Sequence, residues 1–198
     1  MRIKVAILAV SNKRRHDRSH YRYCVAGITE NGEWIRLVAD EDGDSLPDDI
    51  ALRRSYVIDA DVKYAPLKYQ PENAILVNYK RINDEFNNYV KLLRPQAERY
   101  IFGNTLNRLN ESEMKWANGS LRLVKVQNLE IYKKENGGYK VKFVNKGVFY
   151  DNIAMTDPDY YKAKMIGDAN IVISLPNDDG GFNGYYKFVA AIYPNLTT

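Results

Sequence analysis

Residues 5–38 read VAILAVSNK, RRHDRSHYR and YCVAGITENGEWIRLV, and this stretch decides the fold of the first half of the chain. Its apolar pattern predicts a strand over residues 3–10, then a charged loop, then strands over residues 23–29 and 33–38. The pair Asn31-Gly32 separates the last two strands. Such a pair predicts a tight hairpin, because both residues tolerate the positive φ that the turn requires.

The loop after the first strand is strongly basic. Residues 13–22 carry Lys and Arg at five positions against the single acid Asp17. A basic run is most often a solvated surface, and its alternative role is to bind a polyanion. This region also offers Arg22, Tyr23 and Trp34. The residues that we predict to bind nucleic acid here are Ser11, Lys13, Arg14, Arg15, Arg18, Tyr21 and Arg36.

The remainder of the first half predicts a small barrel. Strands are expected over residues 56–64 and 74–78, which makes five strands in about 78 residues with no helical period between them. A helix is expected over residues 83–93, with Asn83 as its cap. Residues 96–119 are mixed and polar, and they are expected to form a connector.

The second half repeats the pattern of the first. A helix is predicted over residues 159–165, because Thr156-Asp157-Pro158 is typical of a helix start. Three strands before this helix and two after it give the element order of an OB-fold. The expected strands cover residues 121–132, 139–144, 148–153, 171–175 and 185–192.

The predicted fold is therefore mainly β, with two tandem OB-like barrels and a few short helices. The first barrel and its trailing helix are expected over residues 1–95, the connector over residues 96–119 and the second barrel over residues 120–198. The second barrel offers Lys and Tyr side chains for a nucleic acid, of which Lys125 and Lys187 are the predicted site residues. The full set is Lys125, Tyr132, Lys140, Lys142, Tyr185 and Lys187.

Charge and composition permit a polyanionic partner without requiring one. The net charge is +4 and the isoelectric point is near 8.9. The apolar run at residues 5–10 is too short for a membrane span, so we expect a cytoplasmic protein with no membrane partner. Cys24 is the single cysteine, which excludes an internal disulfide, and its place in an apolar strand favours a buried thiol.

Eight short motifs occur in register along nearly the whole chain, and together they resemble the family of dual OB-containing domains. The resemblance implies a bacterial protein with two tandem OB-folds, nucleic-acid binding by analogy of fold, and no catalytic residues. The motifs are Ser11-x-Lys13, Cys24-Val25-Ala26-Gly27, Trp34-Ile35-Arg36-Leu37-Val38, Gln70-Pro71-Glu72-Asn73, Ser120-Leu121-x-Leu123-Val124, Thr156-Asp157-Pro158, Ser174-Leu175 and Tyr186-Lys187-x-Val189-Ala190-Ala191.

Three functions stay open at this level. The first is a non-catalytic nucleic-acid-binding protein that favours single strands, uses OB grooves and needs no cofactor or metal. The second is a regulatory or sensing module that binds a small nucleotide or a protein partner. The third is a metal-dependent nuclease. It would use carboxylates or the histidines of the basic loop, and the candidates are His16, His20, Asp157, Asp159, Asp178 and Asp179.

Overall fold

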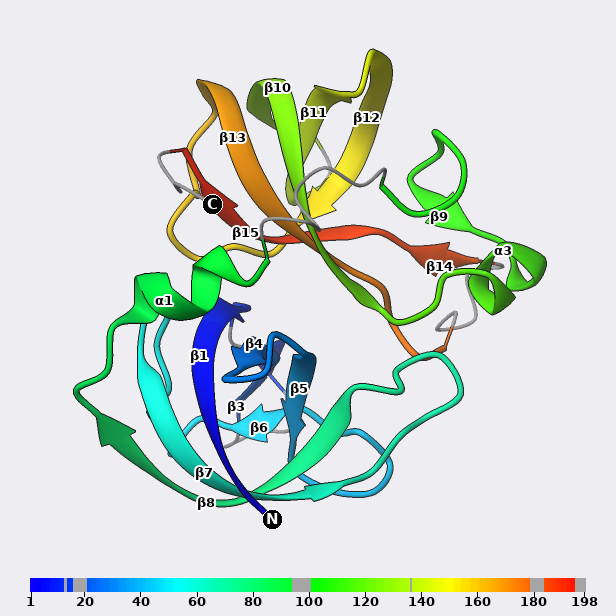
Figure 1. Cartoon of the computed structure of the whole chain (residues 1–198). Coiled ribbons are helices and arrows are strands. Elements are labelled where there is room, and N and C mark those ends of the chain that lie inside the picture. The colour runs from blue at the N-terminus through cyan, green and yellow to red at the C-terminus, as the bar shows by residue number, and fades with distance from the viewer. Residues whose placement is uncertain (13, 16–20, 94–100, 136, 179–183, 195–198) are drawn as a thin grey trace. The chain divides into compact units, whose positions relative to one another are not determined.

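The computed structural model describes residues 1–12, 14–15, 21–93, 101–135, 137–178 and 184–194, and at 14–15 the backbone alone (Figure 1). The chain divides into two compact units, Met1–Arg94 and Pro95–Thr197. Each unit contains one closed barrel of five strands. The predicted fold class, mainly β with two tandem barrels, is therefore confirmed.

The first barrel has the strand order β1-β4-β5-β8-β7, and β7 closes the ring by pairing with β1. All neighbouring strands are antiparallel except β5 and β8, which are parallel. The third barrel strand thus lies beside the fifth, which gives the Greek-key barrel of an OB-fold. The strands are β1 (Arg2–Val10), β4 (Val25–Thr29), β5 (Trp34–Val38), β7 (Val57–Tyr64) and β8 (Asn73–Ile82).

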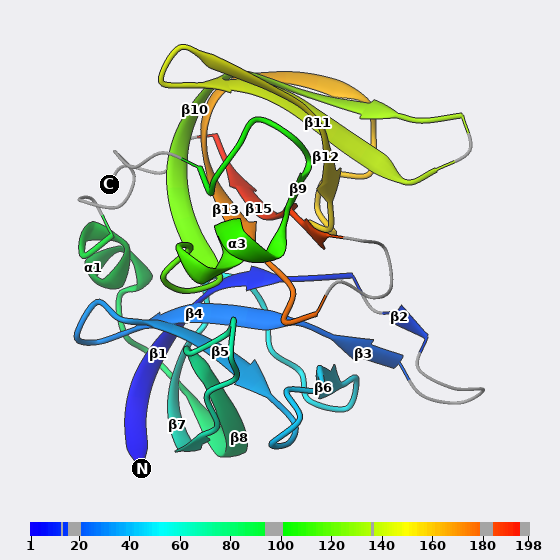
Figure 2. The same ribbon diagram turned by 90° about the vertical axis from the view of Figure 1, so that its right-hand side faces the viewer.

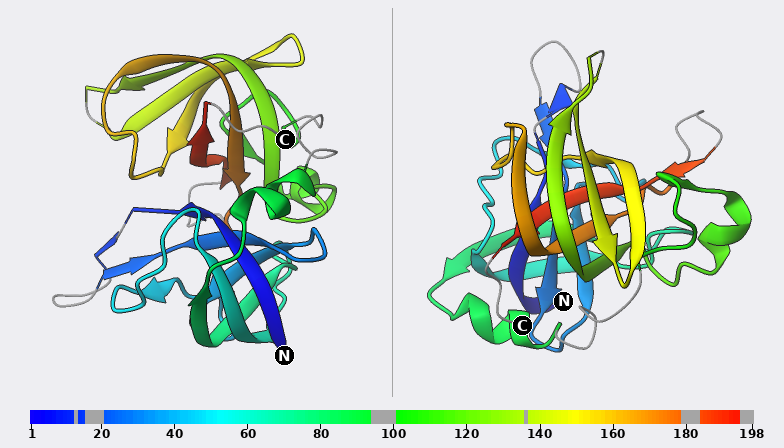
Figure 3. Two further views of the ribbon diagram at one scale, coloured as in Figure 1. Left: turned by 60° about the vertical axis from the view of Figure 1, so that its left-hand side comes forward. Right: turned by 90° about the horizontal axis from the view of Figure 1, so that it is seen from above.

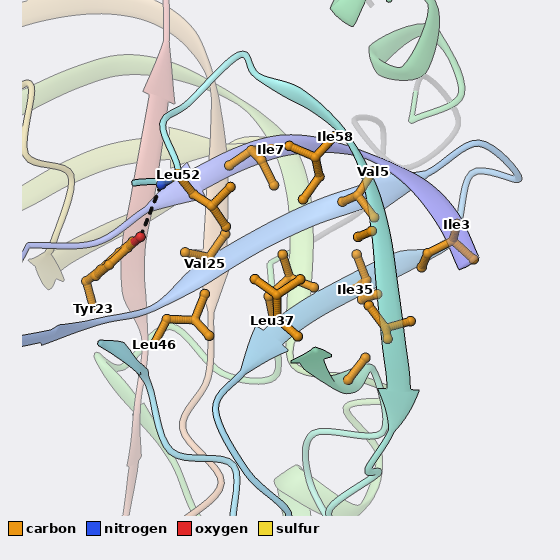
Figure 4. Packing of buried hydrophobic residues seen from close by; sticks show 14 residues of the cluster. Ile3, Val5, Ile7, Tyr23, Val25, Ile35, Leu37, Leu46, Leu52 and Ile58 are labelled. Carbon is orange, nitrogen blue, oxygen red and sulfur yellow. Dashed lines mark hydrogen bonds between the residues drawn. The ribbon is translucent and has the colours of Figure 1, made fainter. Parts of the chain in front are cut away.

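The core of this barrel forms because alternate residues of its strands point inward. Ile3, Val5 and Ile7 of β1 pack with Ile35 and other apolar residues inside the barrel (Figure 4). The close approach of β1 and β4 depends on Gly27, where a Cβ atom would lie 2.5 Å from the carbonyl oxygen of Ala6. A larger residue at this position would push the two strands apart.

The hairpin between β4 and β5 differs from its prediction in one detail. Its closing pair is Thr29 and Glu33, whose backbone hydrogen bond from the Thr29 N–H measures 2.9 Å. The turn therefore contains three residues, and Gly32 has a positive φ of 81° whereas Asn31 does not. A three-residue turn needs one left-handed residue at its end, so the predicted positive φ at Asn31 is wrong.

The second barrel has the order β10-β11-β12-β15-β13, and β13 pairs with β10 to close it. Its parallel pair is β12 with β15, so it has the same topology as the first barrel. The right-hand view of Figure 3 shows these strands, coloured from yellow-green to red. They are β10 (Leu121–Lys133), β11 (Tyr139–Asn145), β12 (Val148–Met155), β13 (Lys164–Ser174) and β15 (Phe188–Tyr193).

The helix predicted over residues 159–165 does not form, and β13 already begins at Lys164. The carboxylate of Asp157 is buried and accepts hydrogen bonds from the backbone N–H groups of Asp159 at 3.0 Å and Ile192 at 2.7 Å. The second bond ties the residue to β15. Asp157 therefore organises a turn against the barrel, and the helix prediction from its local pattern is wrong.

The predicted helix over residues 83–93 is shorter than expected. Helix α1 covers Phe86–Lys91, and its N-cap is Glu85, which makes no side-chain capping bond. The predicted cap at Asn83 is therefore wrong. Asp84 stabilises this region instead, because its carboxylate accepts hydrogen bonds from the Tyr89 hydroxyl at 2.9 Å and from the Glu85 N–H at 3.1 Å.

The described part of the segment between the barrels belongs to the second unit. It contains strand β9 (Arg108–Leu109) and helix α3 (Glu111–Lys115). The helix starts with a reciprocal capping box between Asn110 and Glu113. Strand β9 pairs with β14 (Tyr185–Tyr186), which precedes the last barrel strand. This pairing attaches the segment to the second barrel.

Candidate nucleic-acid interface

The described parts of the basic loop contribute strands to a small three-stranded sheet beside the first barrel (Figure 2). The loop joins β1 to β4, the first and second barrel strands, and this connection binds ligands in many OB-folds. Strand β2 (Arg14–Arg15) pairs with β3 (Tyr21–Tyr23), and β3 pairs with β6 (Leu46–Pro47). The register places Arg22 opposite both Arg14 and Pro47.

This small sheet is anchored to the barrel by Tyr23. The ring of Tyr23 is buried, its hydroxyl donates to the carbonyl oxygen of Ile50, and it accepts a hydrogen bond from the Leu52 N–H at 3.2 Å (Figure 4). Burial raises the pKa of this hydroxyl. We call strands β2 and β3 with their connection the basic hairpin. Because Ile50 and Leu52 are remote from Tyr23 in the sequence, these two bonds fix where the basic hairpin leaves the barrel.

Ser11 is a structural partner of Cys24. The Ser11 N–H donates to the Cys24 carbonyl at 2.9 Å, and the Cys24 N–H donates to the Ser11 hydroxyl at 2.8 Å. This pair closes the base of the hairpin. Cys24 itself is exposed, with its sulfur 3.2 Å from the Ser45 hydroxyl, so the prediction of a buried thiol is wrong. The strand breaks at this residue, which turns the side chain out of the core.

The side chains of the hairpin are only partly described. Tyr21 is 43% exposed. Arg22 forms an ion pair with Asp44. Lys13 and Arg18 lie outside the described residues, as do the side chains of Arg14 and Arg15.

Arg36 is buried in the first barrel, at 6% exposure. Its guanidinium group lies 3.8 Å from the carboxylate of Glu72, and its backbone N–H donates to the Glu72 carbonyl at 3.0 Å. Every residue of β4 is also buried. Arg36 therefore stabilises the barrel where β5 meets β8, and its burial removes it from the accessible binding residues.

The second barrel differs from the first, in which β4 is fully buried. Its second and third strands, β11 and β12, have an accessible outward face. Val141 and Phe143 of β11 point inward and are buried, and the residues between and beside them point outward. Lys140 and Lys142 lie on this outer face of β11, and Phe149 on β12 is 58% exposed. We call the set Tyr132, Lys140, Lys142, Phe149 and Asp151 the outer face of the second barrel.

Ion pairs and hydrogen bonds order this outer face. Lys142 lies 3.0 Å from the carboxylate of Glu130 and 5.9 Å from the centre of the Tyr132 ring. The Tyr132 hydroxyl donates to Asp151 at 2.7 Å. Partial burial, followed by this bond, raises the pKa of Tyr132 to about 12. The ring is thereby held in one orientation beside a cation.

Lys140 lies opposite Tyr132 in the strand register. Partial burial lowers the pKa of its amine, and the nearby charge of Lys134 lowers it further. An anion placed beside these two amines would relieve their repulsion. The outer face therefore combines two features that single-stranded nucleic acids require, namely cations for phosphates and aromatic rings for bases.

The two site residues predicted in the second barrel have different environments. Lys125 is exposed on β10, opposite Asn170 of β13. Lys187 is completely buried, and its amine donates to the carbonyl oxygens of Asn104 at 2.5 Å and Leu106 at 2.8 Å. Lys187 therefore holds the segment before β9 against the barrel, and its burial removes it from the accessible binding residues.

Burial lowers the pKa of Lys187 to about 8 from its ordinary value of 10.5. Between about pH 8 and about pH 10 this amine therefore holds more protons in the unfolded chain than in the folded chain, and its contribution to the free energy of unfolding should rise with pH by about 1–2 kcal/mol. The rise is measured by urea unfolding at both pH values, as the difference between the unsubstituted protein and the Lys187→Met variant. An equal change with pH in both proteins would contradict the assignment.

The candidate metal ligands of the nuclease hypothesis do not form a cluster in the described part of the chain. No three His, Cys, Asp or Glu side chains among the described residues are placed to hold a metal ion. The Asp157 carboxylate is engaged by backbone N–H groups, while His16, His20 and Asp179 lie outside the described residues. In the described residues no helix has the length and apolar character to cross a membrane.

The sequence pattern of the dual OB-containing domain matches residues 3–192, nearly the whole chain. The chain belongs to the dual OB-containing domain family. The resemblance inferred from the eight motifs is thus confirmed, and the two barrels of identical topology are the two OB-folds of this dual OB protein. A search of the curated proteins gives no match.

Two solved structures are similar to the dual OB protein over most of their length. One is described as the structure of a murine DNA binding protein bound with ds DNA, with 8% identity, 97% of this chain and 93% of that chain covered, and a TM-score of 0.39. The other is the tetrameric p202 HIN2, with 11% identity, coverage of 98% and 92%, and a TM-score of 0.35.

The sequence patterns found part of the outer face and missed another part. Tyr132, Lys140 and Lys142 were among the basic and aromatic residues noted for the second barrel. Phe149 was not among them. Alternation along residues 148–153 places its side chain on the outer side of β12, because the next residue, Tyr150, is buried. The signal for Phe149 is the alternation itself, because an outward-facing aromatic residue on a strand is exposed.

Proposed function

We propose that the dual OB protein is a non-catalytic nucleic-acid-binding protein that favours single strands. The observation that carries this proposal is the outer face of the second barrel, where Lys140 and Lys142 lie beside Tyr132. Phe149 is exposed on the neighbouring strand β12, opposite Val144 of β11. The exposed face of the second and third strands is where OB-folds bind oligonucleotides. Cationic amines meet the phosphates there, and exposed rings stack on unpaired bases.

The preference for single strands follows from the aromatic side chains. Phe149 is 58% exposed, and a base can stack on such a ring only when it is free of its own neighbours. In a duplex the bases are stacked on each other, so the ring would gain little. Single strands in extended form present both their bases and their phosphates.

The hairpin of the first barrel is proposed as a second contact region. It contributes Tyr21 and Arg22, and the sequence adds four basic residues and Ser11 around them. Its position between the first and second barrel strands supports this role, because OB-folds use that connection for ligands. The proposed residues of the two regions are Ser11, Lys13, Arg14, Arg15, Arg18, Tyr21, Arg22, Lys125, Tyr132, Lys140, Lys142 and Phe149.

A salt titration tests this proposal directly. A fluorescein-labelled oligothymidylate of about 20 nucleotides is titrated with the protein at several salt concentrations, and the association constant is measured by fluorescence anisotropy. We expect log K to fall linearly with log salt, by about 0.7 for each phosphate that a Lys or Arg neutralises. A slope near zero would overturn the proposal. Saturable binding of a mononucleotide with little salt dependence would support the small-nucleotide module instead.

A further inference from the structure

An acidic segment, residues 40–49, lies directly beside the basic hairpin of the first barrel. Strand β6 at Leu46–Pro47 pairs with β3, so that Arg22 faces Pro47 and Tyr23 faces Leu46. Tyr23 and Leu46 are both buried. Backbone pairing and core packing therefore hold the acidic segment against the hairpin, and the contact does not depend on the attraction between their charges.

One carboxylate of this segment meets the hairpin. Asp44 forms an ion pair with the guanidinium group of Arg22, and the two side chains are 50% and 27% exposed. The backbone around Asp44 is ordered independently of its carboxylate. Its N–H donates to the Asp40 side chain at 3.0 Å, and its carbonyl accepts from the Ala39 N–H at 2.8 Å. The carboxylate can leave Arg22 without a change in the backbone.

A carboxylate and a phosphate make the same kind of contact with a guanidinium group, since both accept charge-assisted hydrogen bonds from its N–H donors. An exposed ion pair of this type is weak, because water screens the charges and two side chains must be ordered. A polyanion gains the release of its condensed counterions when it binds, which an internal carboxylate does not. A nucleic-acid phosphate can therefore replace Asp44 at Arg22.

We propose, on the basis of the nucleic-acid binding proposed above, that Asp44 is an internal competitor for phosphate at Arg22. In the free protein Asp44 occupies the guanidinium group. When a nucleic acid binds, its phosphate displaces the carboxylate. Competition by Asp44 weakens the binding of isolated phosphates and small anions to Arg22. A polyanion can still displace the Asp44 carboxylate, because its binding releases condensed counterions. Asp44 is thus a specificity residue of the hairpin.

The Asp44→Asn variant tests this competition. Asn keeps the size of the side chain and the backbone contacts, and it removes the charge that competes with phosphate. We expect about 1.5- to 5-fold tighter binding of the labelled oligothymidylate, in line with the weak interaction of an exposed ion pair. In the unsubstituted protein, the Asp44 carboxylate attracts a salt cation once it is displaced, which offsets part of the counterion release. The Asn variant lacks this carboxylate, so its salt dependence should be steeper by up to about 0.7 in log K per log salt.

Glu41→Gln is the matched control. It removes one negative charge from the same segment, but Glu41 is paired with Lys63 at 2.5 Å, on β7 and outside the hairpin. We expect it to change the affinity less than Asp44→Asn does. A double variant, Arg22→Gln with Asp44→Asn, is the third protein. Its affinity for the oligothymidylate is compared with that of Arg22→Gln alone. In that background the Asn substitution should give no gain, because the contested guanidinium group is gone.

The outcomes separate this inference from the function on which it rests. Equal tightening by Asp44→Asn and Glu41→Gln would show a general charge effect and overturn the inference, with nucleic-acid binding intact. A gain from Asp44→Asn that persists without Arg22 would also overturn it. No binding by either the unsubstituted protein or Asp44→Asn would overturn the proposed function and the inference together.

Discussion

Replacing Lys140 and Lys142 by Gln is expected to weaken oligonucleotide binding about ten-fold or more at low salt, and to reduce the salt slope by about 1.4, which is two phosphate contacts of about 0.7 each. Both amines lie on the outer face of the second barrel. Removal of Lys142 also leaves the carboxylate of Glu130 without this partner, so that it repels the nucleic acid. The anisotropy titration described above measures both effects.

The control for this experiment is the pair Lys63→Gln and Lys80→Gln. Lys63 and Lys80 are exposed on β7 and β8, the fourth and fifth strands of the first barrel. Lys63 also forms an ion pair with Glu41. The two proteins carry the same net charge change. An equal loss of affinity in both would contradict a site on the outer face and would indicate a general response to net charge.

Replacing Asp157 by Ala is expected to lower the free energy of unfolding by about 2–4 kcal/mol. Asp157 is only 1% exposed, and its carboxylate accepts hydrogen bonds from the backbone N–H groups of Asp159 and Ile192. Ala would leave these two donors without the acceptor they use, and the turn before β13 would lose its tie to β15. Urea unfolding followed by circular dichroism measures the change.

Asp168→Ala provides the comparison for this prediction. Asp168 is an exposed residue on β13 in the same barrel, and its substitution should change the free energy of unfolding by less than about 0.5 kcal/mol. A similar decrease in the free energy of unfolding in both variants would contradict the prediction, because it would indicate a general effect of removing a negative charge from the second barrel. An unchanged stability in Asp157→Ala would show that its buried hydrogen bonds contribute nothing.

Local pattern predicted strands such as β7 and β11 because burial of one face produces an alternation that can be read along the chain. Strands buried on both faces, such as β4, were predicted from short apolar runs. The same reasoning failed at Thr156-Asp157-Pro158. Aspartate is a common helix cap, but its carboxylate can accept from any nearby N–H group. Here a donor 35 residues later in the chain, on Ile192, decides its role. Such a contact has no local signature.

Two of the predicted site residues differ from expectation in their burial. Lys and Arg are usually exposed, so Arg36 and Lys187 were natural candidates for a nucleic-acid surface. In the folded chain both are buried, and they are stabilised by Glu72 and by the carbonyl oxygens of Asn104 and Leu106. Whether a cation meets solvent or a buried acceptor depends on which segments pack over it.

The stretch at residues 5–38 by itself determined the first three barrel strands, the hairpin between two of them and a basic insertion after the first. These features follow from side-chain periodicity and turn chemistry, which act over a few residues. The tertiary structure alone decided which charged groups remain accessible. It buried Arg36, set Asp44 against Arg22, and left Lys140 and Lys142 on an open face. The physical reason is that solvation and ion pairing depend on distances between segments remote in the chain.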